Sequence, residues 1–209
     1  MLYIIGAGGH GKVVINAARS MDTYSAIFFL DDDPAKHGRH IMHAEVIGPT
    51  NALPDPAPGL FVFPAIGFDN DLRLVFLQRL LDKGYAVPVL VHATAYVAPT
   101  AELGVGSVVM AQAAVNPDAR LGRGCIVNTG ATVDHDCVLH DGVHLAPGVH
   151  LSGNVVVGAR TLVGTGANII HEMNVGADCV IGAGAAVVSD IPDGMLAAGV
   201  PARVLKKAE

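Results

Sequence analysis

The densest group of residues able to do acid–base chemistry is a short run in the second half of the chain, Asp134-His135-Asp136. Histidine titrates near neutral pH, and a neighbouring carboxylate orients the imidazole ring and raises its basicity. This combination suits a general base, although simple solvation of a surface histidine beside acids is the alternative. His140 and His144 follow closely, in a chain with 10 histidines. The run predicts proton transfer at His135.

A second candidate site lies near the N-terminus, where Gly6, Gly8 and Gly11 follow an apolar stretch and open a helical one. Glycines at a helix N-terminus expose backbone N–H groups to a phosphate. An acidic side chain after the second strand can accept a hydrogen bond from a ribose or a base. This part of the chain holds only one βαβ half, which favours a nucleotide over a redox dinucleotide. A merely tight strand-to-helix turn is the structural alternative.

The elements that position His135 follow from a period of six. From Val97 to Val187, every sixth residue is Val, Leu or Ile, and the positions four further on are almost all small or apolar. This pattern is typical of a triangular parallel β-helix, in which three short strands make one coil of about eighteen residues. We expect about five coils, with turns supplied by glycines such as Gly104 and Gly122. The three cysteines occupy the inward small position, so we expect buried, unpaired thiols at Cys125, Cys137 and Cys179.

The first part of the chain alternates strands with helices, which indicates a small parallel α/β domain. Strands are expected at 2–5, 26–30, 61–66 and 86–90, and helices at 11–20 and 72–83. We therefore expect an α/β domain with a small, half-Rossmann-like parallel sheet at residues 1–92. A β-helix of hexapeptide repeats with a C-terminal tail is expected at residues 93–209.

Composition limits the class of protein. The net charge of −6 offers no basic field to a phosphate backbone, so we expect no nucleic-acid partner. Every run of about 18 residues contains Gly, Pro or a polar residue, so we expect no membrane span. The start of the chain lacks a positively charged signal segment, and with three cysteines this favours a cytoplasmic protein with reduced thiols.

Zinc is the rival chemistry for the histidines, because some β-helix enzymes bind it with three histidines. His135 and His140 have the spacing of such a ligand pair. No third histidine lies at Pro99–Gly104, about two coils upstream, and His171 lies two coils away, about 9.5 Å along the axis. We therefore expect no metal site.

Three features together resemble a known family: the six-residue repeats, the stretch Gly6–Lys12 (GAGGHGK) and the tail Gly199–Ala202 (GVPA). Essentially the whole chain is similar to the sugar acetyltransferases typified by bacillosamine, perosamine and sialic acid acetyltransferases. The most specific likeness is Asn128–Cys137 (NTGATVDHDC), which looks like that family's stretch around its catalytic histidine. The resemblance implies a left-handed β-helix and a homotrimer with active sites between the prisms. It also implies transfer of acetyl from acetyl-CoA to the amino group of a nucleotide-linked 4-amino sugar.

The resemblance further implies roles for individual residues. His135 would be the general base and Asp136 the acid that increases its basicity. The expected contacts of acetyl-CoA are His144 at the thioester end, Gly153 and Thr165 along the pantetheine, and Lys206 of the lysine pair in the tail, beside a phosphate. The expected contacts of the acceptor are Gly8, Gly9, His10 and Gly11 at the phosphates and sugar, Asp31 and Asp32 at the nucleoside, and Asn70, Arg73 and Asn128. Asn70 and Arg73 lie in a stretch, Ala65–Arg73, that looks one residue longer than the family's pattern.

Other reactions remain as alternatives at this point. O-acetylation of a sugar hydroxyl, as in the sialic acid acetyltransferases, is the runner-up. A zinc anhydrase and a scaffold without chemistry are more distant, and the intact Asp134-His135-Asp136 run argues against the scaffold.

Overall fold

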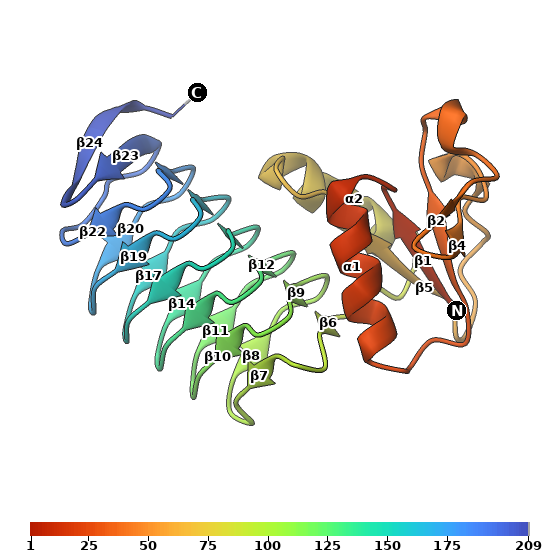
Figure 1. Cartoon of the computed structure of the whole chain (residues 1–209), viewed down its shortest axis with the longest axis horizontal. Helices are drawn as coiled ribbons and strands as arrows, with labels where there is room; N and C mark the ends of the chain where they lie inside the picture. Colours follow the sequence, from red (N-terminus) through yellow and green to blue (C-terminus); the bar gives the residue numbers. More distant parts are fainter. Residues whose placement is uncertain (209) are drawn as a thin grey trace.

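The computed structural model describes residues 1–208, which form two parts that lie side by side (Figure 1). The first part is an α/β domain with a parallel sheet in the order β2-β1-β5. Its main elements are β1 (Leu2–Ile5), α1 (Gly9–Ser20), β2 (Ile27–Leu30), β5 (Phe61–Pro64) and α2 (Asn70–Asp82). Between β2 and β5 lie the short elements η1 (Pro34–Lys36), β3 (His40–Ile41), β4 (Ala44–Glu45) and η2 (Thr50–Ala52). Alternate residues of β1 pack on opposite sides, so Ile4 faces α1 and Ile5 faces α2.

The second part is a parallel β-helix with three flat faces. Face 1 contains β7 (Tyr96–Val97), β10 (Ala114–Val115), β13 (Thr132–Val133), β16 (His150–Leu151), β19 (Asn168–Ile169) and β22 (Ala186–Val187). Face 2 contains β8 (Glu102–Leu103), β11 (Arg120–Leu121), β14 (Val138–Leu139), β17 (Val156–Val157) and β20 (Asn174–Val175). Face 3 contains β6 (Leu90–Val91), β9 (Val108–Val109), β12 (Ile126–Val127), β15 (His144–Leu145), β18 (Leu162–Val163) and β21 (Val180–Ile181). The antiparallel hairpin β23 (Met195–Gly199) and β24 (Ala202–Lys207) ends the prism on the same face.

The period of six is confirmed by the strand pairing. From β6 to β22, successive strands on each face pair in parallel eighteen residues apart, as Val115 does with Val133. The step shortens to sixteen residues where Ile181 of β21 pairs with Ala197 of β23. The aliphatic residues of the series are buried, except that the first two, Val97 and Leu103, are partly exposed. The three cysteines are buried and unpaired, as expected.

The glycines at the corners serve a different purpose from the one expected. Gly104 and Gly122 do not adopt the left-handed conformation that favours glycine. A Cβ at Gly104 would instead collide with the backbone of Gly122 in the next coil. These glycines are therefore needed because neighbouring coils approach closely at this corner, and not because of the turn itself.

The strand expected at residues 86–90 is wrong. Ala86 makes only a single bridge to Phe61, and the chain then leaves the sheet because Pro88 lacks an N–H to donate. Leu90 and Val91 instead form β6, which pairs with β9 as the first strand of the prism.

The α/β domain covers the beginning of face 3. Leu90, Val108 and Ile126 on this face share one apolar core with α1 and with Phe29 of the sheet. Helix α2 lies along the edge between faces 2 and 3, where Leu74 contacts the glycine corner at Gly142. Neither helix in residues 1–208 is long and apolar enough to cross a membrane.

Arg73 of α2 joins the two parts. Its side chain is 1% exposed, and its Nε and Nη2 donate to the carbonyls of Gly124 and Gly142 on two successive coils, at 2.7 and 2.8 Å. The remaining N–H groups donate to Asn70 Oδ1 and to the carbonyls of Ile66 and Gly67. Burial lowers the pKa of Arg73 to about 10, which keeps the guanidinium charged at neutral pH.

Replacing Arg73 should destabilise the protein strongly. Arg73→Met leaves several buried carbonyls without a donor, so we expect a loss of at least about 3 kcal/mol in the free energy of unfolding. Urea unfolding at fixed protein concentration measures this loss. Arg79→Met, an exposed position on the same helix, is the control, and equal losses in the two variants would contradict the bridging role.

Candidate active site

His135 lies in the turn between β13 and β14, on the edge that joins faces 1 and 2. Its Nδ1 is 2.8 Å from Asp136 Oδ2, and the two side chains are 55% and 52% exposed. The hydrogen bond to Asp136, with the negative charges of Asp134 and Asp136, raises the pKa of His135 above its ordinary value. Among the residues that the structure describes, His135 Nε2 has no hydrogen-bond partner. The ring therefore presents its second nitrogen to solvent.

The backbone around His135 is held by the coil before it. Asp136 adopts a left-handed conformation, with φ of 60°, which Asp tolerates better than most residues. Asp134 Oδ1 accepts from the backbone N–H of His135 at 2.8 Å and from Asn116 Nδ2 at 3.2 Å. Asn116 was not among the residues expected at the site. Its position eighteen residues before Asp134 is the sequence signal for this contact.

His144 lies on face 3, under the junction with the α/β domain, and is 4% exposed. Asn128 Oδ1 accepts from the backbone N–H of Thr129, which turns the Asn128 amide nitrogen toward His144 Nε2 at 3.3 Å. The neutral ring then accepts at Nε2 and carries its hydrogen on Nδ1, and Nδ1 is buried without a hydrogen-bond partner among residues 1–208. Burial, followed by the charges of Arg73 and His10, lowers the pKa of His144 to about 4.

His10 and Phe68 complete this junction. The His10 ring packs on Gly67, where an added Cβ would lie 3.2 Å from His10 Cγ, and burial lowers the pKa of His10 to about 4. Phe68 is 86% exposed, and its ring centroid lies 6.1 Å from that of His144. Phe68 was not expected to contribute to the site, although it lies in the stretch that is one residue longer than the family's pattern.

The N-terminal glycines have two different roles. A Cβ at Gly8 or Gly9 would have no heavy atom within 4 Å, so the start of α1 is open to a ligand. A Cβ at Gly11 would collide with the backbone of Gly6 and approach Phe29. Gly11 therefore allows the helix to pack closely against the loop, and the open N–H groups belong to the turn before it.

Asp31 and Asp32 hold the loops beside these glycines. Asp31 Oδ2 accepts from the Ala7 N–H and from Lys36 Nζ, both at 2.8 Å. Burial opposes the charge, but these hydrogen bonds outweigh it and lower the pKa of Asp31. Asp32 Oδ1 accepts from the Thr50 N–H and hydroxyl at 2.7 and 2.9 Å. Both acids thus shape the loops at the carboxyl end of the sheet.

The structure corrects the expectation for Asn70 and Arg73. The N–H groups of the Arg73 guanidinium are used within this chain, and Asn70 Nδ2 donates to the Arg160 carbonyl at 2.6 Å. Both side chains are buried and join the two parts; Arg73 is closed off from a nucleotide, whereas Asn70 also lines the hollow beside the start of α2.

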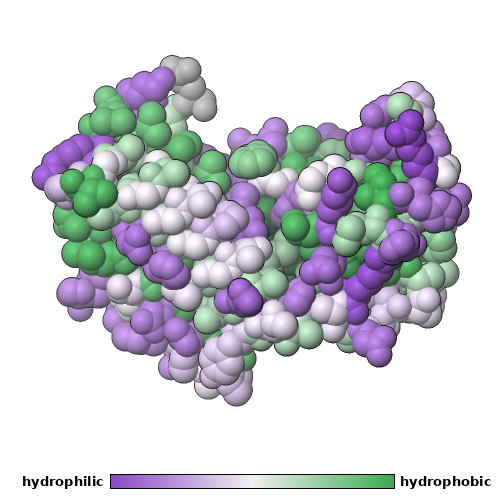
Figure 2. All heavy atoms as spheres, viewed as in Figure 1, coloured by the Kyte–Doolittle hydropathy of each residue, from purple (hydrophilic) through white to green (hydrophobic). Residues whose placement is uncertain are grey.

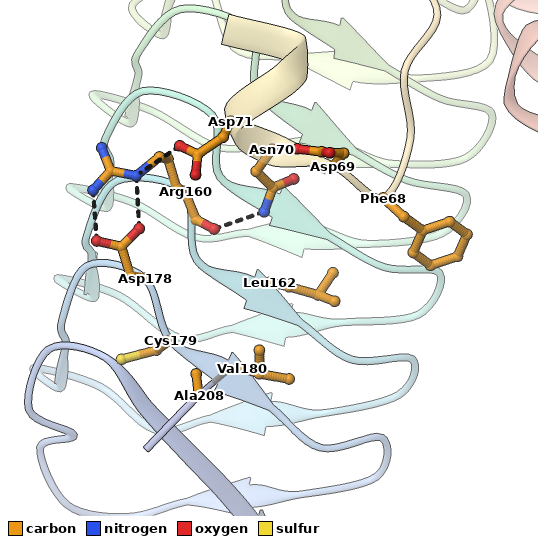
Figure 3. A pocket seen from close by; sticks show the side chains of 10 residues that line it. All are labelled: Phe68, Asp69, Asn70, Asp71, Arg160, Leu162, Asp178, Cys179, Val180 and Ala208. Carbon is orange, nitrogen blue, oxygen red and sulfur yellow. Dashed lines mark hydrogen bonds and ion pairs between the residues drawn. The ribbon is translucent and has the colours of Figure 1, made fainter.

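A hollow of about 500 Å³ lies beside the start of α2 (Figure 3). Leu162 and Val180 continue the column of His144 along face 3, and Phe68 lies at the edge of this hollow. Its far wall is Arg160, whose Nη2 is 2.5 Å from Asp178 Oδ2 and whose Nε is 3.1 Å from Asp71 Oδ1. Figure 2 shows the surface dipping between the end of the prism and the α/β domain.

The other expected contacts of acetyl-CoA are spread along the prism. Gly153 lies one coil beyond His135 on the same edge, directly against the imidazole. Thr165 is exposed in a turn between faces 3 and 1, and Lys206 lies on β24. In the part of the chain covered by the structure, no three His, Cys, Asp or Glu side chains lie close enough to hold a metal ion.

One chain does not bring all of these groups together. In a triangular coil each edge lies opposite one face, and the edge with His135 lies opposite face 3, which the chain's own α/β domain covers. His10, Asn128, His144 and Phe68 gather on that covered side. His135 and Gly153 lie on the other side of the prism.

Comparison with known proteins gives consistent matches. The family model of the PglD N-terminal domain matches residues 1–80. The acetyltransferase domain of PglB from Neisseria gonorrhoeae, solved with acetyl coenzyme A, is 45% identical, with 98% of each chain covered and a TM-score of 0.92. A mutant of perosamine N-acetyltransferase from Caulobacter crescentus, solved with CoA and GDP-perosamine, is 41% identical. That match covers 99% of this chain and 97% of the other, with a TM-score of 0.91. WeeI from Acinetobacter baumannii is 26% identical, with 98% and 99% covered and a TM-score of 0.88.

Burial of His144 should make stability depend on pH. The folded-state pKa of about 4 lies below the ordinary histidine pKa of 6.5, so the unfolded chain binds the proton more readily. Stability is thus fully present above pH 6.5 and falls as the pH drops toward 4. We expect His144 to account for a loss of about 2 kcal/mol in the free energy of unfolding between pH 7 and pH 5.

Urea unfolding of His144→Gln at the two pH values tests this expectation. The variant should lose about 2 kcal/mol less than the wild type over this interval. His171→Gln, at an exposed histidine, is the control and should retain the wild-type dependence. An unchanged pH dependence in His144→Gln would show that His144 is not held neutral.

Proposed function

Because this chain belongs to the family of hexapeptide-repeat sugar N-acetyltransferases with a left-handed β-helix, we propose that it acetylates the amino group of a nucleotide-linked 4-amino sugar with acetyl-CoA. The observation that carries the proposal is the His135–Asp136 pair, with Nδ1 engaged at 2.8 Å and Nε2 open to solvent. A base of this kind serves transfer to an amine. The structures of the two relatives with acetyl coenzyme A and with GDP-perosamine support the choice of substrates.

His135 acts as the general base in this proposal. The sugar nitrogen attacks the thioester carbonyl, so a C–N bond forms and the C–S bond breaks. The proton of the nitrogen passes to His135 Nε2 and then to the departing sulfur, which leaves as CoA thiol. Asp136 accepts a hydrogen bond from His135 Nδ1 and stabilises the imidazolium formed during the step. Backbone N–H groups steady the oxyanion.

The acceptor binds on the α/β domain. Its phosphates lie at the open N-terminus of α1 beside Gly8 and Gly9, where backbone N–H groups attract anions. Its nucleoside lies near the loops shaped by Asp31 and Asp32 at the carboxyl end of the sheet. The sugar then extends toward His10 at the junction with the prism.

Acetyl-CoA lies along face 3. Its thioester end lies beside His144, whose Nδ1 is buried without a hydrogen-bond partner among residues 1–208. Leu162 and Val180 follow at about 4.8 Å per coil and offer an apolar path for the pantetheine toward the hairpin that carries Lys206. Thr165 contributes from the turn between faces 3 and 1, whereas Gly153 lies beside His135 on the edge opposite face 3 and reaches this acetyl-CoA only from another copy.

The site is complete only in an oligomer. His135 lies on the edge opposite the face that carries the chain's own acceptor domain, so it must act on substrates held by another copy. We propose a homotrimer of parallel prisms in which the edge with His135 of one copy meets face 3 of the next.

Removing the base should abolish most of the activity without changing the assembly. His135→Ala should lower kcat by about 10²–10⁴-fold, because general-base catalysis contributes about that much. Release of CoA thiol from acetyl-CoA with a set of nucleotide 4-amino sugars measures the rate, and light scattering measures the oligomer. Near-normal turnover by His135→Ala would refute the general-base role.

Removing the carboxylate should shift the pH profile in a defined direction. The base must be neutral to act, and Asp136 raises the pKa of His135. Asparagine tolerates the same left-handed backbone as aspartate. Asp136→Asn should therefore move the acidic limb of the pH profile of kcat/KM to lower pH and also lower the plateau of that profile. Asp118→Asn, the equivalent left-handed position one coil earlier, is the control. An unshifted limb in Asp136→Asn would contradict the pairing.

A further inference from the structure

The His135 imidazole lies against Gly153, the residue one coil further along the same edge. An ideal Cβ built at Gly153 would lie 2.5 Å from both Cε1 and Nε2 of His135 and 3.1 Å from Cδ2. Real Cβ contacts are essentially never closer than 3.0 Å. A single added methyl group would therefore displace the ring.

We propose that Gly153 is the positioning residue for His135, because the space left by its missing side chain holds the imidazole in the orientation that meets Asp136. The catalytic consequence rests on the proposed function, but the placement of the ring does not.

The backbone does not require glycine at this position. Gly153 lies outside the left-handed region, and the neighbouring left-handed residue is Asn154. A requirement for glycine must therefore come from what a side chain would touch, and the atoms that it would touch belong to His135.

The two coils cannot move apart to relieve the collision. The Asn154 N–H donates to the His135 carbonyl at 3.0 Å, and the Glu172 N–H donates to the Gly153 carbonyl at 3.0 Å. These bonds belong to a ladder that runs along the whole edge. The His135 side chain, which is 55% exposed, is the group that can move.

The sequence along this edge agrees with the proposal. The residues at the equivalent position of successive coils are Pro99, Pro117, His135, Gly153 and His171. Glycine stands only in the coil directly after His135. The other coils carry full side chains in the same backbone position.

Displacing the ring would break its hydrogen bond to Asp136. The Asp134 carboxylate is oriented toward the backbone, because its Oδ1 accepts from the His135 N–H and from Asn116 Nδ2. The other titratable groups in neighbouring turns of this edge are Asp118 before His135, and His171 and Glu172 beyond Gly153. A displaced His135 should therefore lose most of the rise in its pKa.

The alternative role for Gly153 is to line the path of acetyl-CoA. In that case Gly153→Ala would raise KM for acetyl-CoA and leave kcat, the pH profile and His135 itself unchanged. Two measurements therefore distinguish the roles: whether Gly153→Ala changes KM or kcat, and whether it changes the titration of His135.

The test is a double-variant cycle of Gly153→Ala and His135→Ala, with Ser152→Ala as the control in the same turn. Gly153→Ala should lower kcat by about 10- to 100-fold and move the acidic limb of kcat/KM to lower pH. NMR titration of the histidine ring signals should show the His135 pKa falling toward its ordinary value. In the His135→Ala background, Gly153→Ala should leave Tm unchanged, because the ring that the methyl group would meet is gone.

Equal loss of Tm from Gly153→Ala in both backgrounds would overturn the proposal, and so would an unshifted His135 titration. If His135→Ala keeps its turnover, the general base is assigned wrongly. The NMR titration and the Tm cycle still decide whether Gly153 positions the ring, so the two failures are distinguishable.

Discussion

The structure depends on one constraint: from β6 to β22, successive strands on each face of the prism pair in parallel at a constant step of eighteen residues. Inward positions therefore stack on inward positions, which explains a chain that is 51% hydrophobic but only 5% aromatic. Bulky aliphatic side chains fill the prism and small residues fit beside them, because aromatic rings would not fit the narrow triangle. The same pairing places Asn116 beside Asp134 and Gly153 beneath His135.

A second consequence is the separation of the catalytic groups within one chain. The α/β domain is locked onto face 3 by a shared apolar core and by Arg73, which reaches two coils and the loop before α2. This lock leaves the opposite edge, with His135, uncovered. In the proposed mechanism, the nucleotide side and the base meet only where one prism packs on another, so catalysis would require assembly.

Much of the prism could be predicted from sequence, because its contacts repeat every coil and a repeated contact leaves a period. A contact that occurs only once in the fold leaves no period in the sequence. The burial of Arg73 depends on how α2 meets the glycine corner, and the departure of Ala86–Leu90 from the sheet depends on Pro88 and on the start of β6. His135 and Asp136 were predictable as neighbours in one turn. The neutral state of His144 was not, because it depends on burial at the junction with the α/β domain and on the charges of Arg73 and His10.

The most direct test of the shared site is a mixed oligomer of two inactive chains. Gly9→Glu places a negative side chain at the proposed phosphate site, where a Cβ meets no neighbouring atom, so the fold should survive. His135→Ala lacks the base. When the two variants are unfolded, mixed in equal amounts and refolded together, random assembly should restore about one quarter of the wild-type rate, because that share of sites combines an intact domain with an intact base from another copy. No gain over the separately refolded variants would contradict a site divided between copies.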